Sequence, residues 1–285
     1  MKQLHWDQFC VMTTHYQQHT LEYTLDSIAA NGFRNVELWG ASPHYCYDDY
    51  TPSGRNARVQ EICRMLKSRG LKMPVFTPEQ LRQYTINIAS SDTYVQKWSE
   101  DIMMRYLEDT VSFDAQYMSL LPGWEFLDAK SDANYQRAIE SMGRLAARAA
   151  QLGVTMVMEE VAPCESSFVT CLPELQRILR DVNSPALTAC IDLPTATANG
   201  EQVDDFYAQC STVGHVHLAD GSPDGYLALG TGQNDVTSQL EALAAHGYAG
   251  TVSLYLNDAS FFTDPDTPTR QSAIWLRKSS LVRGV

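Results

Sequence analysis

Eight short apolar runs alternate along the whole chain with stretches that have the periodicity of amphipathic helices, and this alternation limits the choice of fold more than any other feature. The runs are FCVMT (9–13), FRNVELW (33–39), LKMPVFT (71–77), AQYMSLL (115–121), VTMVME (154–159), ALTACID (186–192), VGHVHLA (213–219) and GTVSLYL (250–256). The clearest helical stretches are 20–32, 55–70 and 135–153, and each ends at a glycine, which commonly follows the last helical turn. Continuous apolar strands that are each followed by a helix indicate a parallel sheet buried on both faces.

Eight such units in 285 residues predict an α/β protein with a single (β/α)8 TIM barrel, one domain over residues 1–285. No low-complexity linker or change of composition divides the chain. A doubly wound, dinucleotide-binding sheet is the weaker alternative, because no G-x-G-x-x-G motif follows the first run.

Charge and cysteine content exclude several classes of function. The formal net charge of −13 makes nucleic acid an unfavourable partner, because such a surface repels phosphate backbones. The chain has no run of about 18 apolar residues, and its N-terminus lacks the apolar core of a signal peptide. We therefore expect a cytoplasmic protein that does not bind membranes. The seven cysteines are scattered without a C-x-x-C pair, which favours reduced thiols over disulfides or a zinc ribbon.

One segment, GHVHLAD (214–220), places two histidines and an aspartate within an otherwise apolar strand. Side chains two residues apart on a strand share a face, so His215 and His217 should point the same way. Two interpretations are open for this pair taken alone. The histidines face a metal ion, or they are buried and satisfied by neighbouring carbonyl groups.

Acids and imidazoles recur at the same phase of the repeat, at the ends of the strands. Chemistry in a barrel gathers at these carboxyl ends, and Glu159, Asp192 and His217 end three successive runs. This shared phase indicates one site at the barrel mouth. Other polar or aromatic residues at strand ends are Glu37, Trp39, His44, Glu79, Trp124, Glu125, Glu160, Glu165 and Asp220.

These motifs resemble sugar isomerases and epimerases with the xylose isomerase-like barrel, and among them most closely the fructoselysine 3-epimerases. The resemblance covers nearly the whole chain. It is carried by NVELWGASPHYC, FTPEQ, MEEVAPCES, CIDLP and GHVHLAD, and by the helix-to-strand turns NGFRNVELW and HGYAG.

The resemblance implies a divalent metal ion held by Glu, Asp, His and Glu from strands five to eight. The matching residues are Glu159, Asp192 and His217. Such ligands suit Mn, Mg or Co, and also Zn. His215 then lies one layer deeper, about 7 Å away, and is expected to be structural. The resemblance also matches Glu165 to a residue that binds substrate hydroxyls, whereas Glu160 should point away from the mouth towards a helix or solvent.

Strand eight departs from the family pattern. Alignment from HGYAG places Tyr255 where relatives have the fourth ligand, a glutamate, and Asp258 is an off-phase substitute in the following loop. A second departure is Thr231, where many relatives have an acid. The resemblance therefore allows weak metal binding or none.

The chemistry implied by the resemblance is proton transfer on a keto-sugar or fructosamine-type substrate through a metal-stabilised enediolate, with one glutamate on each face. The catalytic candidates are Glu159 and Tyr255. Tyrosine is a poor base, since its reference pKa is about 10. Three interpretations remain open. Tyr255 protonates the second face of an epimerase, Glu159 alone supports isomerisation, or the barrel binds a sugar derivative without turnover.

The substrate-binding candidates are Glu165, His44, Glu79, Trp39 and Asp220, and possible further wall residues are Phe76, Tyr84, Asn87 and Trp124. The remaining histidines, 5, 15, 19 and 246, show no phase with the site and are expected at the surface.

Two enzyme classes on the same fold are alternatives. Metal-dependent endonucleases need more histidines at strand ends and a basic groove, which the charge argues against. A dehydratase with the same metal set is not separable by sequence. We expect a small sugar or sugar-amine as the partner, and a homo-oligomer is compatible with the acidic surface.

Overall fold

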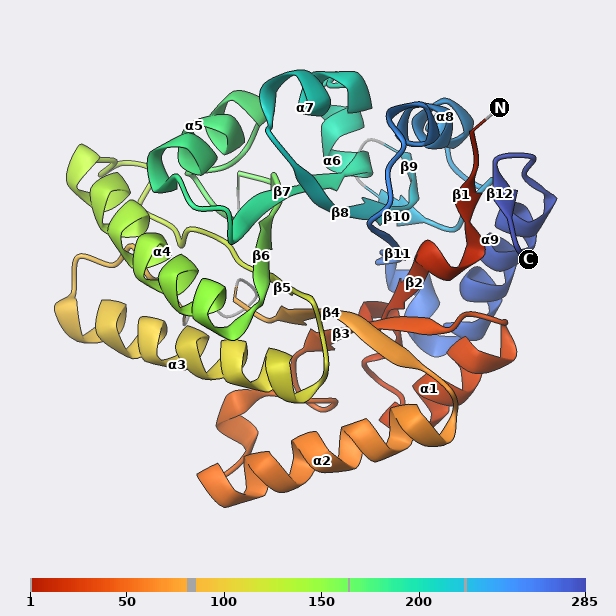
Figure 1. Ribbon diagram of the computed structural model, residues 1–285, viewed down its shortest axis with the longest axis horizontal. Coiled ribbons are helices and arrows are strands. Elements are labelled where there is room, and N and C mark those ends of the chain that lie inside the picture. Colours follow the sequence, from red (N-terminus) through yellow and green to blue (C-terminus); the bar gives the residue numbers. More distant parts are fainter. Residues whose placement is uncertain (1, 81–85, 164, 223–224) are drawn as a thin grey trace.

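The computed structural model describes residues 2–80, 86–163, 165–222 and 225–285. Eight parallel strands close into a barrel in the order β11-β2-β3-β4-β5-β6-β7-β8 (Figure 1). Their bounds are β2 (Phe9–Met12), β3 (Asn35–Gly40), β4 (Lys72–Pro78), β5 (Tyr117–Ser119), β6 (Thr155–Met158), β7 (Leu187–Asp192), β8 (Val213–Leu218) and β11 (Thr251–Leu254). Each predicted apolar run overlaps one barrel strand, so the predicted (β/α)8 barrel is confirmed.

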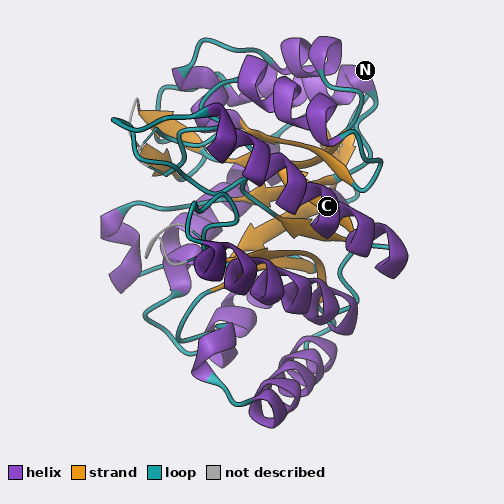
Figure 2. Cartoon of the chain, turned by 90° about the vertical axis from the view of Figure 1, so that its left-hand side faces the viewer, coloured by secondary structure: helices purple, strands orange, loops and turns teal. Residues whose placement is uncertain are grey.

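Helices surround the barrel on the outside (Figure 2). They are α1 (Leu21–Ala30), α2 (Pro52–Ser68), α3 (Thr93–Ser112), α4 (Asp132–Leu152), α5 (Leu172–Val182), α6 (Leu193–Ala198), α7 (Val203–Gln209), α8 (Val236–His246) and α9 (Asp266–Lys278). Short 3-10 turns are η1 (Trp6–Gln8), η2 (Thr14–Tyr16), η3 (Tyr47–Asp49) and η4 (Ala259–Thr263). Parallel pairing of β1 (Leu4–His5) with β12 (Val282–Arg283) joins the two ends of the described chain. No helix among the described residues is long and apolar enough to cross a membrane.

The local sequence explains where the helices begin and end, as α4 shows. The Ser131 hydroxyl accepts the N–H of Asn134 at the N-terminus, and Gly153 ends the helix with a positive φ of 72°. The buried face lies on one side at helical spacing and contains Ala138, Met142, Leu145, Ala146 and Ala149. Burial of one large apolar side chain of this kind contributes about 1.5–3 kcal/mol.

The strand register brings the ends of the later strands to one level. Asp192 of β7 lies beside His217 of β8, and His217 lies beside Ser253 of β11. Glu159 directly follows β6, and Tyr255 directly follows β11. The side chains at the ends of β6, β7, β8 and β11 therefore meet at one edge of the barrel.

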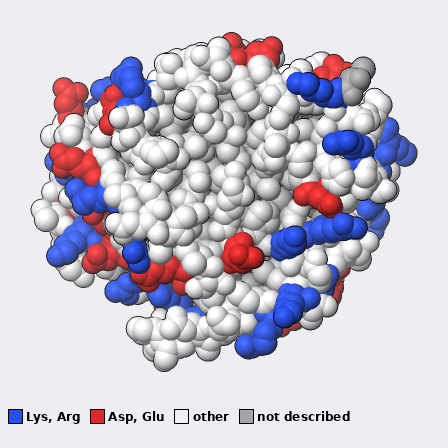
Figure 3. Space-filling model, viewed as in Figure 1, with Lys and Arg blue, Asp and Glu red and all other residues white. Residues whose placement is uncertain are grey.

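Charged side chains of both signs are interspersed around the periphery of the face seen in Figure 3. One surface expectation is wrong: His15 is fully buried, with Nε2 2.9 Å from the Thr269 hydroxyl. It follows β2 in η2, where the chain packs against α9. His246 is exposed, and His5 and His19 are half-buried.

Candidate active site

A cavity of about 240 Å³ opens at the carboxyl ends of the barrel strands. Its lining comes from the ends of most barrel strands and from the segments that follow them, as expected for the mouth of such a barrel. The lining residues are Met12, Thr14, Trp39, Thr77, Pro78, Glu79, Gln80, Ser119, Leu121, Glu159, Glu160, Val161, Ala162, Glu165, Asp192, Tyr226, Tyr255 and Asn257.

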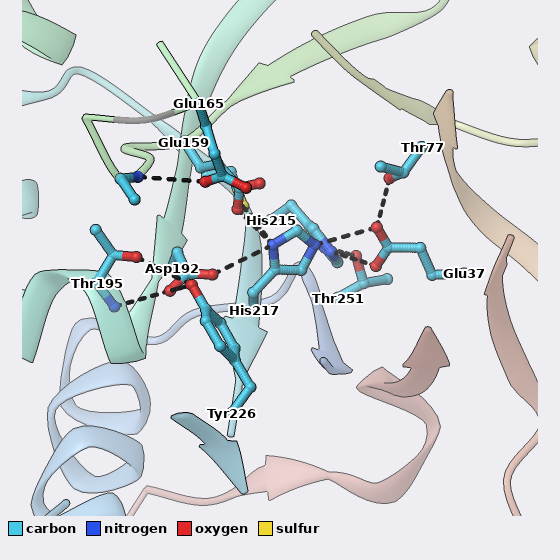
Figure 4. A network of polar contacts seen from close by, with 12 residues as sticks. Glu37, Thr77, Glu159, Glu165, Asp192, Thr195, His215, His217, Tyr226 and Thr251 are labelled. Atoms are coloured by element: carbon cyan, nitrogen blue, oxygen red, sulfur yellow. Dashed lines mark hydrogen bonds and ion pairs between the residues drawn. The ribbon is translucent and has the colours of Figure 1, made fainter. Parts of the chain in front are cut away.

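Two carboxylates converge on one nitrogen of His217 beside this cavity (Figure 4). Nδ1 of His217 lies 2.5 Å from Oε2 of Glu159 and 3.8 Å from Oδ2 of Asp192. The imidazole is buried, whereas the Glu159 side chain is 13% exposed and faces the open space. Although burial opposes protonation, the Glu159 carboxylate raises the pKa of His217 well above its ordinary value. The structure therefore brings the three predicted ligand residues together.

Glu37 holds the other side of both histidines. Its Oε1 lies 3.1 Å from Nε2 of His217, its Oε2 lies 2.9 Å from Nε2 of His215, and the Thr77 hydroxyl donates to Oε1 at 2.5 Å. Burial opposes ionisation of Glu37, but His217 and His215 hold its pKa well below the ordinary value. An ionised carboxylate only accepts hydrogen bonds, so both Nε2 atoms carry hydrogen. Nδ1 of His217 is thus the nitrogen that can bind a cation, once it has released its proton.

The second nitrogen of His215 is also satisfied, because Nδ1 lies 2.7 Å from the Thr251 hydroxyl. His215 is fully buried and does not line the cavity. It therefore has the polar surroundings of a packed core histidine, with side-chain partners in place of carbonyl groups.

Asp192 is anchored through the oxygen that does not face His217. Its Oδ1 accepts the N–H of Thr195 at 2.9 Å and the phenol of Tyr226 at 3.1 Å. Burial, and then the nearby Glu159 carboxylate, raise the pKa of Asp192 to about 7. Oδ2 is left facing the imidazole, as a single-oxygen ligand would require.

Tyr255 provides an aromatic wall beside the imidazole. Its ring centroid lies 5.2 Å from that of His217 and 4.7 Å from that of Tyr226, and the ring packs with Met12 and Trp39. Burial, and then the Glu159 carboxylate, raise the pKa of Tyr255 above its ordinary value. The phenol is therefore protonated at neutral pH and can donate a proton, but it cannot accept one.

The donor set fits a divalent cation. Two carboxylates and one imidazole are ligands that Mn, Co, Mg or Zn accepts. Cys190 lies within 4.8 Å of Glu159 and His217, but burial raises the pKa of its thiol to about 12, so it remains neutral. Glu37, His215 and His217 form a second close group, yet Glu37 and His215 do not line the cavity, and their hydrogen bonds occupy the facing atoms. The group that includes Glu159 is therefore the better candidate.

The other predicted substrate-binding residues divide into two sets. Glu165, Glu79 and Trp39 line the cavity. His44 does not, because it is buried with Nε2 2.9 Å from the His19 carbonyl oxygen. Asp220 does not either, because its carboxylate accepts backbone N–H groups of the loop that follows, those of Gly221, Gly230, Gly232 and Asn234. A role for His44 or Asp220 in direct substrate contact is thus at odds with their positions.

The structure also gives positions for other residues that the sequence singled out. The carboxyl group of Glu160 reaches Asn199 at the end of α6, so it points towards a helix, and burial raises its pKa to about 9. Asp258 caps η4 and does not line the cavity. Phe76 is in the core, whereas Asn87 donates to the Trp124 carbonyl outside the cavity lining. Tyr84 lies outside the described residues.

Two functional candidates were not singled out from the sequence. Glu37 stood among the strand-end acids, but nothing in FRNVELW shows that it faces two histidines across the barrel. Tyr226 reaches Asp192 from the antiparallel hairpin of β9 (Asp220–Ser222) and β10 (Gly225–Leu227). A lone aromatic residue in a loop carries no sequence signal for this contact.

Comparison with known proteins identifies the family and agrees with the fold. Residues 25–279 match the family described as xylose isomerase-like TIM barrel. The chain is 20% identical to fructoselysine 3-epimerase of Escherichia coli O157:H7, over 88% of this chain and 93% of that one. It is 26% identical to ketose 3-epimerase of Arthrobacter globiformis, over 93% and 86%. The structure of D-psicose 3-epimerase with D-tagatose from Clostridium cellulolyticum H10 superposes with a TM-score of 0.77 at 17% identity, over 97% of each chain.

Proposed function

Because this chain belongs to the xylose isomerase-like TIM barrel family, we propose that it is a divalent-metal-dependent epimerase or isomerase of a keto-sugar or of a sugar–amine adduct. The observation that carries the proposal is the convergence of Glu159 and Asp192 on Nδ1 of His217 at the edge of a cavity. The names of the curated relatives, fructoselysine 3-epimerase and ketose 3-epimerase, support a sugar substrate.

The residues present would divide the work of binding and proton transfer. Glu159, Asp192 and His217 would hold the ion, and Glu37 would keep the imidazole turned towards it. When bound, the ion would supply Lewis acidity at the substrate carbonyl. Glu159 would remove the proton from the neighbouring carbon, since its carboxylate is the partly exposed one of the group. Glu165 and Trp39 would contact the sugar, as cavity-lining residues.

Tyr255 decides which proton transfers the site can perform. Epimerisation returns a proton to the opposite face of the same carbon, whereas isomerisation needs one base on one face. A protonated Tyr255 can supply the proton to the second face, and in the reverse reaction the same phenol would have to give up and regain that proton, which its raised pKa opposes. We propose that Tyr255 is the acid of the second face, and that Glu159 alone would suffice if the reaction is isomerisation.

The test combines metal binding with hydrogen exchange. We expect the purified protein to bind Mn²⁺ at micromolar concentration by calorimetry. With Mn²⁺ in D2O, it should incorporate deuterium into D-psicose or D-tagatose, observed by NMR. Deuterium at C3 would identify an epimerase and deuterium at C1 an isomerase, and Glu159→Gln should abolish both. Binding of metal and sugar without exchange would identify the non-catalytic alternative, and absence of metal binding would overturn the proposal.

A further inference from the structure

Apart from a carboxyl oxygen of Glu160, which Glu201 can hydrogen-bond, two buried polar groups of cavity-lining residues have no hydrogen-bond partner among the described residues. They are Nε2 of Gln80 and the hydroxyl of Thr14. Gln80 is 6% exposed and Thr14 is 1% exposed, and both residues line the cavity. A buried donor left without a hydrogen bond is costly, so such groups in a folded protein call for an explanation.

The position of these groups in the barrel is opposite the proposed metal ligands. Gln80 follows β4, which stands four places from β8 and His217 in either direction around the closed barrel. Thr14 follows β2, which stands four places from β6 and Glu159. A molecule that spans the cavity would therefore meet the carboxylates at one side and these two groups at the other.

A backbone contact fixes the orientation of the Gln80 amide. Its Oε1 accepts the N–H of Leu121 at 3.0 Å, and this N–H can only donate. The amide oxygen must therefore face Leu121, and the NH2 group is the part of the side chain that has no partner among the described residues. The geometry gives Gln80 one role towards a ligand, that of a hydrogen-bond donor.

The surroundings select the chemistry of that ligand. The lining contains the carboxylates of Glu79, Glu159, Glu160, Glu165 and Asp192, and no lysine or arginine among the described residues. The described lining thus offers a phosphate or carboxylate several acidic groups and no lysine or arginine to balance its charge. An uncharged hydroxyl can accept from Gln80 and both donate to and accept from Thr14.

We propose that Gln80 and Thr14 form a subsite for an uncharged hydroxyl at the end of the substrate that lies away from the carbonyl. This inference rests on the proposed function, since it assumes a sugar whose carbonyl end faces Glu159, Asp192 and His217. It names the substrate class more narrowly: a polyol chain that is not phosphorylated at that end. Gln80 and Thr14 would set specificity and take no part in proton transfer.

Calorimetric binding of D-psicose to the Mn²⁺-loaded protein tests the subsite. Thr14→Val keeps the shape of the side chain and removes the hydroxyl, and Gln80→Met removes the amide. Each should weaken sugar binding about 5- to 30-fold, the effect of one lost hydrogen bond, and leave Mn²⁺ affinity unchanged. Thr14→Ser keeps the hydroxyl and should bind as the wild type does. Thr188→Val is the matched control, because the Thr188 hydroxyl is also without a partner but does not line the cavity.

A series of singly deoxygenated ketohexoses identifies the hydroxyl. The analogue that lacks this hydroxyl should bind weakly to the wild type and equally weakly to Thr14→Val. Removing the substrate hydroxyl and removing the Thr14 hydroxyl break the same hydrogen bond, so their effects should not add. Wild-type affinity for D-psicose in both variants would overturn the subsite and leave the proposed function standing. Failure of the Mn²⁺-loaded wild type to bind any ketohexose would overturn the proposed function, and the subsite with it.

Discussion

At the scale of single residues, Glu37 determines how His217 is presented. Its carboxylate accepts from both histidines, which leaves Nδ1 of His217 towards Glu159 and Asp192. In Glu37→Gln the amide NH2 would oppose an imidazole N–H, so the ring would turn or take another tautomer. We expect Mn²⁺ affinity to fall roughly 10- to 100-fold, the range for loss of a group that orients a ligand.

Calorimetry measures this affinity, and nitrogen chemical shifts of the histidines report the tautomer. Thr77→Val is the matched control, since it removes one donor from Glu37 and leaves both histidine contacts. Unchanged metal affinity and unchanged histidine shifts in Glu37→Gln would show that packing alone orients His217.

Tyr255 is the residue at which this chain departs from the pattern it resembles. A carboxylate introduced by Tyr255→Glu would stand beside the imidazole in place of the phenol ring. We expect Mn²⁺ to bind at least about tenfold more tightly, equivalent to about 1.4 kcal/mol, because oxygen ligands suit this ion. Tyr255→Phe keeps the aromatic wall and should leave the metal affinity near that of the wild type. A Tyr255→Glu protein with no gain in affinity would show that this position does not reach the ion.

At the scale of elements, Asp220 shapes the loop that presents Tyr226. It accepts backbone N–H groups from both ends of the segment 221–234, so one carboxylate ties the β9–β10 hairpin to the loop that follows. A Cβ atom at Gly232 would lie 2.4 Å from Oδ1 of Asp220, so the loop also needs glycine there.

Asp220→Asn should therefore destabilise the protein by about 1–3 kcal/mol, because an amide NH2 faces donors that lose their acceptor. Urea unfolding measures this change, and substrate binding should weaken as Tyr226 loses its fixed position. Asp128→Asn, an exposed substitution in another loop, provides the comparison. Equal stability of the two variants would mean that the loop holds its shape without the carboxylate.

His15 links the η2 turn to α9, and its burial predicts a dependence of stability on pH. Burial lowers the pKa of His15 to about 3, whereas in an unfolded chain histidine titrates near about 6.5. Between these values the unfolded state binds the extra proton, so stability from this group is present above about pH 6.5 and is lost as the pH falls. From pH 7 to pH 5.5 the wild type should lose about 1 kcal/mol more than His15→Gln in urea unfolding. Identical pH dependence in the two proteins would contradict a neutral, buried imidazole.

The site shows what a sequence can and cannot predict at these two scales. Glu159, Asp192 and His217 were predicted to meet because the strand repeat sets their phase, and the register of β7 on β8 brings two of them side by side. The contact of Tyr226 with Asp192 comes from a hairpin, and that of His215 with Glu37 crosses the barrel, and periodicity encodes neither. His15 was expected at the surface because it shows no phase with the site, and it is buried because η2 packs on α9.

At the scale of the whole molecule, the fold followed from repetition. Each of the eight apolar runs overlaps one strand of a closed parallel barrel, because such a run must be buried on both faces. The predicted strand ends were less accurate where apolar residues continue past the hydrogen-bonded segment. The run 115–121, for example, contains only the three-residue strand Tyr117–Ser119. The order of the strands could be predicted without a further sequence signal, because each βα unit places the next strand beside the previous one.

The net charge of −13 bears on how metal binding must be tested, because an acidic surface attracts cations without a specific site. Binding to the folded state alone raises stability by about 2.7 kcal/mol at one hundred times the dissociation constant. For a chain of this size we expect Mn²⁺ to raise Tm by roughly 5 °C or more. Thermal unfolding should be measured in about 0.15 M salt, where exposed charges are screened beyond about 8 Å. Asp192→Asn removes one ligand from the group around His217, and its Tm should respond little to Mn²⁺. An equal rise of Tm in wild type and Asp192→Asn would assign the ion to the acidic surface and not to the barrel mouth.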